Sequence, residues 1–282
     1  MKSSFQIAFI CCLSMLLVGT ACKSEFEQIR ASGDAQRIYK KAEAYYADGD
    51  WLKAQTLYEL VIGNYRGKKE LEDIYLKYAY TYFNLEKYIL SSYYFKNFSN
   101  TFTNSAKRQE ADYMSAFSNY KLSPSFRLDQ TSTNKAIDEL QIFVNTYPNS
   151  DKVVVANELI KEMREKLERK AFEEAKLYSD LRQYQAATQS FENMLKDFPE
   201  TSVAEEVRYR IIEAAFLLAE NSIVDKQIER YNEVVKRGKR FLQRYPDSQF
   251  FNEVTLFNKR SDKKLKSINN DRYKNESAGT RR

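Results

Sequence analysis

Few side chains in this 282-residue chain could do covalent or metal chemistry. It has three cysteines, Cys11, Cys12 and Cys22, and no histidine. Without histidine, the Ser-His-Asp and Cys-His nucleophile pairs and the common zinc sites are unavailable. Cys11 and Cys12 lie in an apolar N-terminal segment, so the sequence after it predicts neither a disulfide framework nor a cysteine metal cluster. We predict no cofactor, and only Cys22 stands where a modification would be expected.

Cys22 directly follows a leader with three recognisable parts. Lys2 precedes an apolar run over residues 5–18, and the small residues Gly19-Thr20-Ala21 come next. This order is typical of a secretory signal, and the run is shorter than the roughly 20 residues that span a bilayer. Because it ends on cysteine, the leader resembles a bacterial lipoprotein signal, in which that thiol is acylated and becomes the new N-terminus. An ordinary signal peptide is the alternative.

The lipoprotein resemblance implies a location. Residues 1–21 would be removed, and residues 22–34 would form a lipidated linker. Lys23 replaces the aspartate that retains lipoproteins at the inner membrane in the enterobacterial pattern. We therefore expect anchoring in the outer membrane, facing the periplasm. One acyl chain binds membranes only marginally, so several chains, palmitate among them, would be needed.

An aromatic residue closes a helix-like segment five times along the chain. They are Tyr65, Phe102, Tyr147, Phe198 and Tyr245, spaced 37 to 51 positions apart. Proline directly follows the last three of them. Self-similarity at such a period is the signature of stacked repeats. Proline cannot continue a helix interior and so ends each pair of helices. Stacked repeats mostly provide extended binding surfaces, which disfavours an enzyme.

Small residues recur in pairs inside these segments, each followed by a large residue four positions on. The pairs are Ala42 and Ala54, Ala79 and Ser91, Ala116 and Ala136, and Ala175 and Ala187, with Tyr58, Phe95, Leu140 and Phe191 as the large residues. Small residues let helix axes approach to roughly 8–10 Å while the large one fills the groove beside them. The spacing resembles the tetratricopeptide repeat. We predict an all-α solenoid of about five tetratricopeptide repeats.

The repeats fall into two groups. Residues 35–150 hold repeats one to three, and residues 151–258 hold repeats four and five. The stretch 151–181 has no Gly or Pro and carries apolar residues at four-residue steps, so one long helix should join the third and fourth repeats. Residues 259–282 contain nine Lys/Arg and three Asp/Glu, so the net charge of this segment equals the formal charge of +6 of the whole chain. We expect this tail to be disordered, and the body implies no nucleic-acid groove.

The first helix of each tetratricopeptide repeat lines the concave face of the array. Reading the same positions in repeats one to three gives a row of aromatic residues: Tyr39, Tyr46, Tyr80, Phe83, Tyr113, Phe117 and Tyr120. Aromatic side chains supply a large contact area and are enriched at recognition surfaces. The row predicts a groove for an extended peptide with apolar or aromatic side chains. For any single residue, packing between helices is an equal alternative.

A second candidate surface lies in the fifth repeat. Lys236, Arg237, Lys239 and Arg240 follow one another closely, with Arg244 nearby. As a functional site, this cluster would dock an acidic partner domain, or anionic lipid. The plainer interpretation is a solvated helix face.

The lipoprotein signal, the five repeats and the F-x-x-x-Y-P-x-S closers together resemble the BamD family. The closest passages are residues 143–150 and 175–202. Members belong to the outer-membrane β-barrel assembly machinery. The resemblance implies a non-enzymatic scaffold whose C-terminal repeats bind the POTRA region of the barrel insertase. Its N-terminal groove would engage the C-terminal signals of unfolded outer-membrane proteins.

Two alternatives remain open at this point. The chain could be another periplasmic tetratricopeptide lipoprotein that scaffolds envelope, peptidoglycan or secretion-system assembly. A hydrolase would need Glu43, which falls on the same face as the aromatic row, to work with a second groove-facing acid, and the repeat positions supply none.

Overall fold

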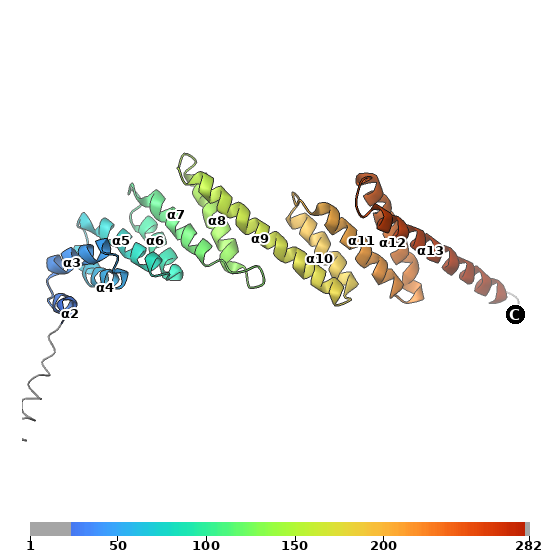
Figure 1. Ribbon diagram of the computed structural model, residues 1–282, viewed down its shortest axis with the longest axis horizontal. Coiled ribbons are helices and arrows are strands. Elements are labelled where there is room, and N and C mark those ends of the chain that lie inside the picture. The colour runs from blue at the N-terminus through green and yellow to red at the C-terminus, as the bar shows by residue number, and fades with distance from the viewer. Residues whose placement is uncertain (1–23, 280–282) are drawn as a thin grey trace, which may run out of the picture. The chain divides into compact units, whose positions relative to one another are not determined.

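The computed structural model describes residues 24–279, with side chains described up to residue 270, and these residues form helices joined by short turns (Figure 1). The helices are α2 (Glu25–Arg30), α3 (Ala35–Ala47), α4 (Trp51–Val61), the 3₁₀ helix η1 (Ile62–Tyr65), α5 (Glu70–Asn84), α6 (Tyr88–Thr101), α7 (Arg108–Lys121), α8 (Thr131–Thr146), α9 (Val153–Asp180), α10 (Tyr184–Asp197), α11 (Ala204–Glu220), α12 (Val224–Arg244) and α13 (Phe251–Gly279).

Contacts divide the chain into two compact units. The first unit runs to Ser123 and includes Thr131–Ile160, so it contains α2 to α8 and the start of α9. The second comprises Pro124–Gln130 and the chain from Lys161 onward. In the first unit α3 to α8 pack each on the next, and in the second α10 to α13 do the same.

The described helices form five pairs, as the repeat spacing predicts. The pairs are α3 with α4, α5 with α6, α7 with α8, the second half of α9 with α10, and α11 with α12. Every predicted small residue is fully buried: Ala42, Ala54, Ala79, Ser91, Ala116, Ala136, Ala175 and Ala187. The weakest repeat follows the same rule, since Ala214 and Gly238 are buried in α11 and α12. The all-α solenoid prediction is confirmed.

The large residues four positions on fill the space beside these close approaches. Tyr58, Phe95, Leu140 and Phe191 are each completely buried. Removing a side chain of this size from water contributes about 1.5–3 kcal/mol. The hydroxyl of Tyr58 does not stay unpaired, because it donates to Glu43 Oε1 at 2.6 Å.

The turn inside three of the pairs has one shared conformation. Gly49, Glu86 and Arg182 have φ values of 77°, 57° and 59°, in the left-handed region. In each case the next backbone N–H reaches back to a tyrosine carbonyl, such as Lys87 N to Tyr82 O at 2.9 Å. This closes the end of the first helix. Only the first of the three turns has the glycine that this conformation favours.

In the last four pairs the aromatic closer caps the second helix, whereas Tyr65 of the first pair ends η1. The amide of Tyr245, for example, donates to Phe241 O at 2.8 Å, and Phe102, Tyr147 and Phe198 do the same four residues back. Three residues after each of these four closers, a hydroxyl accepts an N–H at the start of the next segment, as Lys107 N donates to Ser105 Oγ at 3.0 Å. The equivalent hydroxyls are Ser150, Thr201 and Ser248.

These same hydroxyls also join neighbouring repeats. Ser248 Oγ donates to Glu205 Oε1 at 2.6 Å, and Gln109 Nε2 donates to Ser150 Oγ at 2.6 Å. Ser105 and Thr201 donate in the same way to Glu72 and Glu168. The partner always lies on the first helix of the preceding repeat. The aromatic closer therefore caps a helix, and the hydroxyl three residues after it forms a polar link between neighbouring repeats.

The predicted long helix is α9, a single helix of 28 residues that contributes to both units. The insertion between α7 and α8 packs against its second half. The guanidinium of Arg169 lies 4.3 Å from the Phe126 ring centroid, and Lys170 Nζ donates to Leu128 O at 3.2 Å.

The basic tail differs from the expectation of disorder. Instead α13 continues to Gly279, well into the segment 259–282. Its first part carries Val254, Phe257, Leu265 and Ile268 at helical spacing, and these pack on the core of α11 and α12. We overlooked this apolar stripe because charged residues separate its members.

The left-handed turn at Glu86 yields a stability prediction. Replacing Glu86 by glycine should raise the free energy of unfolding by about 0.5–1 kcal/mol, because glycine adopts this φ without a Cβ clash. The same substitution at Glu158, an exposed residue within α9, should lower it by about 1 kcal/mol. Urea unfolding of both variants measures the difference. Equal losses at the two positions would contradict the strain assigned to Glu86.

Candidate functional sites: an aromatic groove and an arginine cleft

All seven predicted groove aromatics lie in the first unit, on the first helices of its three repeats. Tyr39 and Tyr46 come from α3, Tyr80 and Phe83 from α5, and Tyr113, Phe117 and Tyr120 from α7. Each is partly exposed, neither sealed in the core nor fully solvated. Each of these side chains is therefore part packed against its neighbours and part open to solvent.

Four of these rings form a continuous stack. Phe117 is the centre, with its centroid 5.8 Å from Phe83, 5.7 Å from Tyr113 and 5.7 Å from Tyr120. The planes are inclined by 29°, 10° and 15°, so the rings lie almost parallel. Lys121 Nζ lies 5.4 Å from the Phe117 ring. The stack links the C-terminal end of α5 to α7, and each of its rings is partly exposed.

The remaining three aromatics contact other partners. Tyr39 packs on Tyr65 at 5.1 Å, and Tyr46 contacts Trp51 at 5.2 Å. Tyr80 meets Phe95 edge-on at 4.9 Å. These three belong to the same face by position, but the structure does not join them to the four-ring stack by ring contacts.

Carboxylates lie among these tyrosines. Tyr80 Oη donates to Glu110, and Glu43 receives Tyr58 Oη and forms an ion pair with Lys77. Burial, and then the nearby Glu110 and Glu43, raise the pKa of Tyr46. Burial and the hydrogen bond to Glu110 raise the pKa of Tyr80. Tyrosine hydroxyls are protonated at neutral pH even without these shifts. The hydroxyl of Tyr80 already donates its single proton to Glu110.

Sequence reasoning missed Glu110 and Lys77. Glu110 lies three residues before Tyr113, one further turn along the same helix face. It supplies a second acid on this side, which the hydrolase alternative lacked. Both acids are nevertheless occupied, Glu43 by a tyrosine and a lysine and Glu110 by Tyr80.

The basic cluster of the fifth repeat is not one uniform surface. Arg237 pairs with Glu192 at 2.6 Å and with Glu233 at 2.8 Å, so it connects α12 to α10. Lys236 also pairs with Glu233, at 3.6 Å. Arg237 therefore has a structural role, whereas Lys239 is exposed and, within the described part of the chain, has no ion pair.

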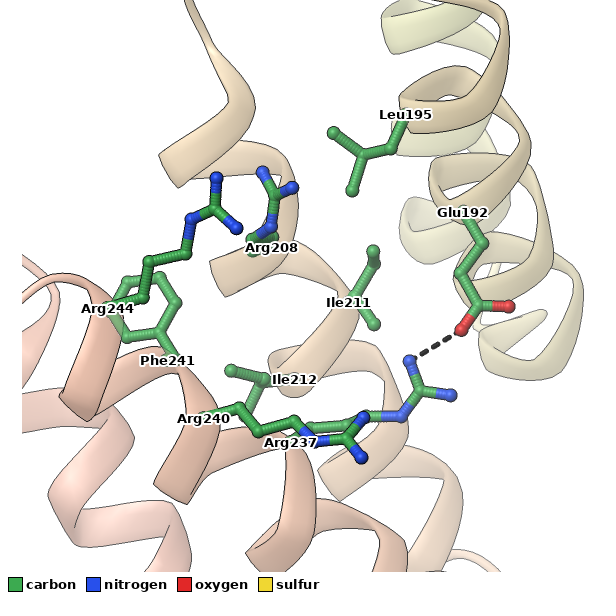
Figure 2. Close-up of a pocket in the computed structure, with 9 residues that line it drawn as sticks. All are labelled: Glu192, Leu195, Arg208, Ile211, Ile212, Arg237, Arg240, Phe241 and Arg244. Carbon is green, nitrogen blue, oxygen red and sulfur yellow. Dashed lines mark hydrogen bonds and ion pairs between the residues drawn. The ribbon is translucent and has the colours of Figure 1, made fainter. Parts of the chain in front are cut away.

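Beside Arg237 lies a cleft of about 300 Å³ between α10, α11 and α12 (Figure 2). Four arginines surround an apolar floor, with Glu192 on one side. The arginines are Arg208, Arg237, Arg240 and Arg244, and the floor consists of Leu195, Ile211, Ile212 and Phe241. Among residues 24–270, no carboxylate pairs with Arg208, Arg240 or Arg244. The cleft can therefore receive an acidic group with an apolar neighbour. Sequence proximity could not reveal Arg208, which comes from another helix.

Three further observations concern lipid attachment, membrane spans and metal binding. Cys22 and the leader lie outside the described residues. None of the described helices is long and apolar enough to cross a bilayer. Within that same part of the chain, no three histidine, cysteine, aspartate or glutamate side chains gather as metal ligands would.

Helix pairs that pack each on the next, with an aromatic face in one unit and an arginine cleft in the other, define a protein of the α-solenoid class. Comparison with known families is more specific. The YfiO family model, described as "Outer membrane lipoprotein", matches residues 31–227. The chain belongs to this family of outer membrane lipoproteins.

A curated relative points the same way. It is a protein of Aquifex aeolicus (strain VF5) named "Putative outer membrane protein assembly factor BamD". The two chains are 25% identical over 249 residues, which cover 86% of this chain and 79% of the relative. The family expected from the repeat closers is thus confirmed.

The ion pairs of Arg237 give a prediction that separates structure from binding. Arg237→Ala should lower the free energy of unfolding by about 1 kcal/mol, because two partly buried carboxylates lose their partner. Lys239→Ala, a neighbouring cation without an ion pair, should change it by less than about 0.5 kcal/mol. Chemical denaturation provides the measurement. If both variants have the free energy of unfolding of the parent, the ion pairs of Arg237 do not stabilise the fold. Arg237 would then be left with a role in binding alone.

Proposed function

We propose that the protein is a non-enzymatic scaffold of the outer-membrane β-barrel assembly machinery. Membership of an outer membrane lipoprotein family and similarity to a protein named as an assembly factor support this proposal. The structural observation that carries it is the four-ring stack on the first unit, whose partly exposed aromatic faces would suit an extended apolar segment. The arginine cleft on the second unit adds a surface of different chemistry.

The first unit would hold the C-terminal signals of unfolded outer-membrane proteins. Such a segment is extended and carries apolar or aromatic side chains. Phe117 and its neighbours offer ring faces, and an added aromatic pair contributes about 0.5–1.5 kcal/mol beyond area burial. Protonated hydroxyls such as that of Tyr46 could bind peptide carbonyls at the same time. The unit corresponds to the predicted repeats in residues 35–150.

The second unit would dock the POTRA region of the barrel insertase. The cleft combines Arg208, Arg240 and Arg244 with an apolar floor, so a partner loop with a carboxylate beside an apolar side chain would fit both. Guanidinium groups bind carboxylates with two parallel hydrogen bonds, which fixes orientation as well as charge. Lys236 and Lys239 would contribute only to the long-range attraction.

Membrane attachment would come from acyl chains on Cys22. The leader is typical of a lipoprotein signal, and the described helices offer no membrane span. Family membership supports association with the outer membrane. We place the repeats on the periplasmic side, where unfolded barrel proteins arrive.

A pull-down of the full chain in mild detergent, followed by mass spectrometry, tests this function. A POTRA-containing barrel protein should co-purify. If envelope, peptidoglycan or secretion-system proteins are recovered instead, the chain is a tetratricopeptide lipoprotein with another assembly role.

Replacing two groove aromatics should weaken peptide binding. We expect Tyr80→Ala with Phe117→Ala to cost about 1–4 kcal/mol in affinity for a barrel C-terminal peptide, as loss of anchor residues does. Fluorescence anisotropy gives the affinity, and circular dichroism checks helicity. Tyr93→Ala is the matched control, since Tyr93 is an exposed aromatic outside the groove. Unchanged binding in a folded double variant would return both residues to a packing role.

Removing the thiol should release the protein. Cys22→Ala, expressed with its leader, should move from the membrane fraction to the soluble periplasmic fraction. The parent should carry the mass of several acyl chains. A variant that remains membrane-bound with unaltered mobility would show that Cys22 is not the anchor.

A further inference from the structure

Large apolar side chains are exposed at the starts of α4 and α6. Leu52 is 59% exposed, Ile89 is 71% exposed and Tyr93 is 58% exposed, with Leu90 beside them. Leu52 and Ile89 occupy equivalent places, since each lies two positions before the buried small residue of its helix. The peptide groove uses none of these side chains. Contiguous exposed apolar residues commonly mark an interaction surface.

The two helix starts adjoin one another in the first unit. Lys87, just before α6, donates to Gln55 Oε1 on α4 at 3.3 Å. Tyr94, next to Tyr93, stacks on Tyr82 at 4.7 Å and so holds the middle of α6 against α5. Ile89, Leu90 and Tyr93 share one face of α6 by their spacing, and Leu52 lies on α4, which the Lys87–Gln55 hydrogen bond joins to the start of α6. We call these four exposed side chains the α4–α6 patch.

The short helix α2 is fixed beside this patch. Phe26 packs on Tyr45 at 6.0 Å, and Glu25 pairs with Lys41 at 2.7 Å. The buried Ile29 adds an apolar contact to the core of the first repeat. Tyr45 also lies under Lys53, the neighbour of Leu52, at 5.1 Å. The start of α2 is thus held on the repeat rather than separated from it by a free linker.

The tether before α2 is very short. Ser24 caps the helix by accepting Glu27 N at 3.3 Å, and Cys22 comes only two residues earlier. Two extended residues span at most about 7 Å. If Cys22 carries the acyl chains, the first repeat cannot move far from the lipid headgroups. This step rests on the proposed lipid anchor.

We propose that the α4–α6 patch lies on the membrane surface next to the anchor. Its aliphatic and tyrosine side chains suit the boundary between headgroups and acyl chains, which surface-bound segments enter by about 5–10 Å. Lys87 and Lys53 flank the patch, and lysine stems can lie along an apolar surface with the ammonium among headgroups. Asp50, two residues before Leu52, forms an ion pair with Lys53 at 2.5 Å.

Single-cysteine labelling tests the patch on the full lipidated chain. After the leader, Cys22 is the only cysteine, so an introduced thiol is the only free one. Leu52→Cys and Ile89→Cys would carry a polarity-sensitive fluorophore in vesicles of phosphatidylethanolamine and phosphatidylglycerol. Ile142→Cys is the matched control, because Ile142 is an aliphatic residue of the same unit and is also 59% exposed.

We expect blue-shifted emission, and quenching by spin-labelled lipids, at positions 52 and 89 but not at 142. Equal, water-like emission at all three positions in acylated protein would overturn the membrane patch while leaving the anchor intact. Emission that shifts only after other membrane proteins are added would also overturn it and assign the patch to a protein partner. Protein whose mass shows no acyl chains would refute the anchor, and the patch proposal with it.

Discussion

The close approach of two helices at a small residue is the constraint on which this structure depends. Ala42 meets its pair at Ala54, and Ala175 meets its pair at Ala187, each without exposed surface. A larger side chain at such a crossing would separate the axes, and the neighbouring Tyr58 or Phe191 would no longer fill the space beside them. Since repeats stack only on their neighbours, this local geometry sets the position of every groove residue in its unit.

The sequence predicted the elements that this constraint controls and little beyond them. Burial of the small and large residues followed from spacing alone, as did the placement of Tyr80 and Phe117 on the first helices of their repeats. Glu110, Lys77 and Arg208 could not be found in that way, because their roles come from contacts between helices of different repeats. The helical tail was missed for a related reason: Leu265 and Ile268 count as apolar periodicity only once α11 and α12 provide a surface for them.

The two units differ in how they could recognise a ligand. In the first, ring faces are open and the acids are already bound by tyrosine or lysine, so shape and apolar contact dominate. In the second, Arg240 and Arg244 border an apolar floor without a carboxylate partner among the described residues, so charge selects the ligand. Under the function that we propose, the first unit would therefore select an extended segment of low charge and the second an acidic folded partner.

The hydroxyl links between repeats have a mechanical consequence. Ser105, Ser150 and Thr201 each attach the start of one repeat to the first helix of the repeat before it, and Ser248 attaches the start of α13 to α11 in the same way. Every link joins nearest neighbours only, so force or heat applied at one end is carried repeat by repeat. Terminal repeats can then fray and re-form while the interior stays folded. A scaffold built this way tolerates pulling by a partner with the loss of one link at a time.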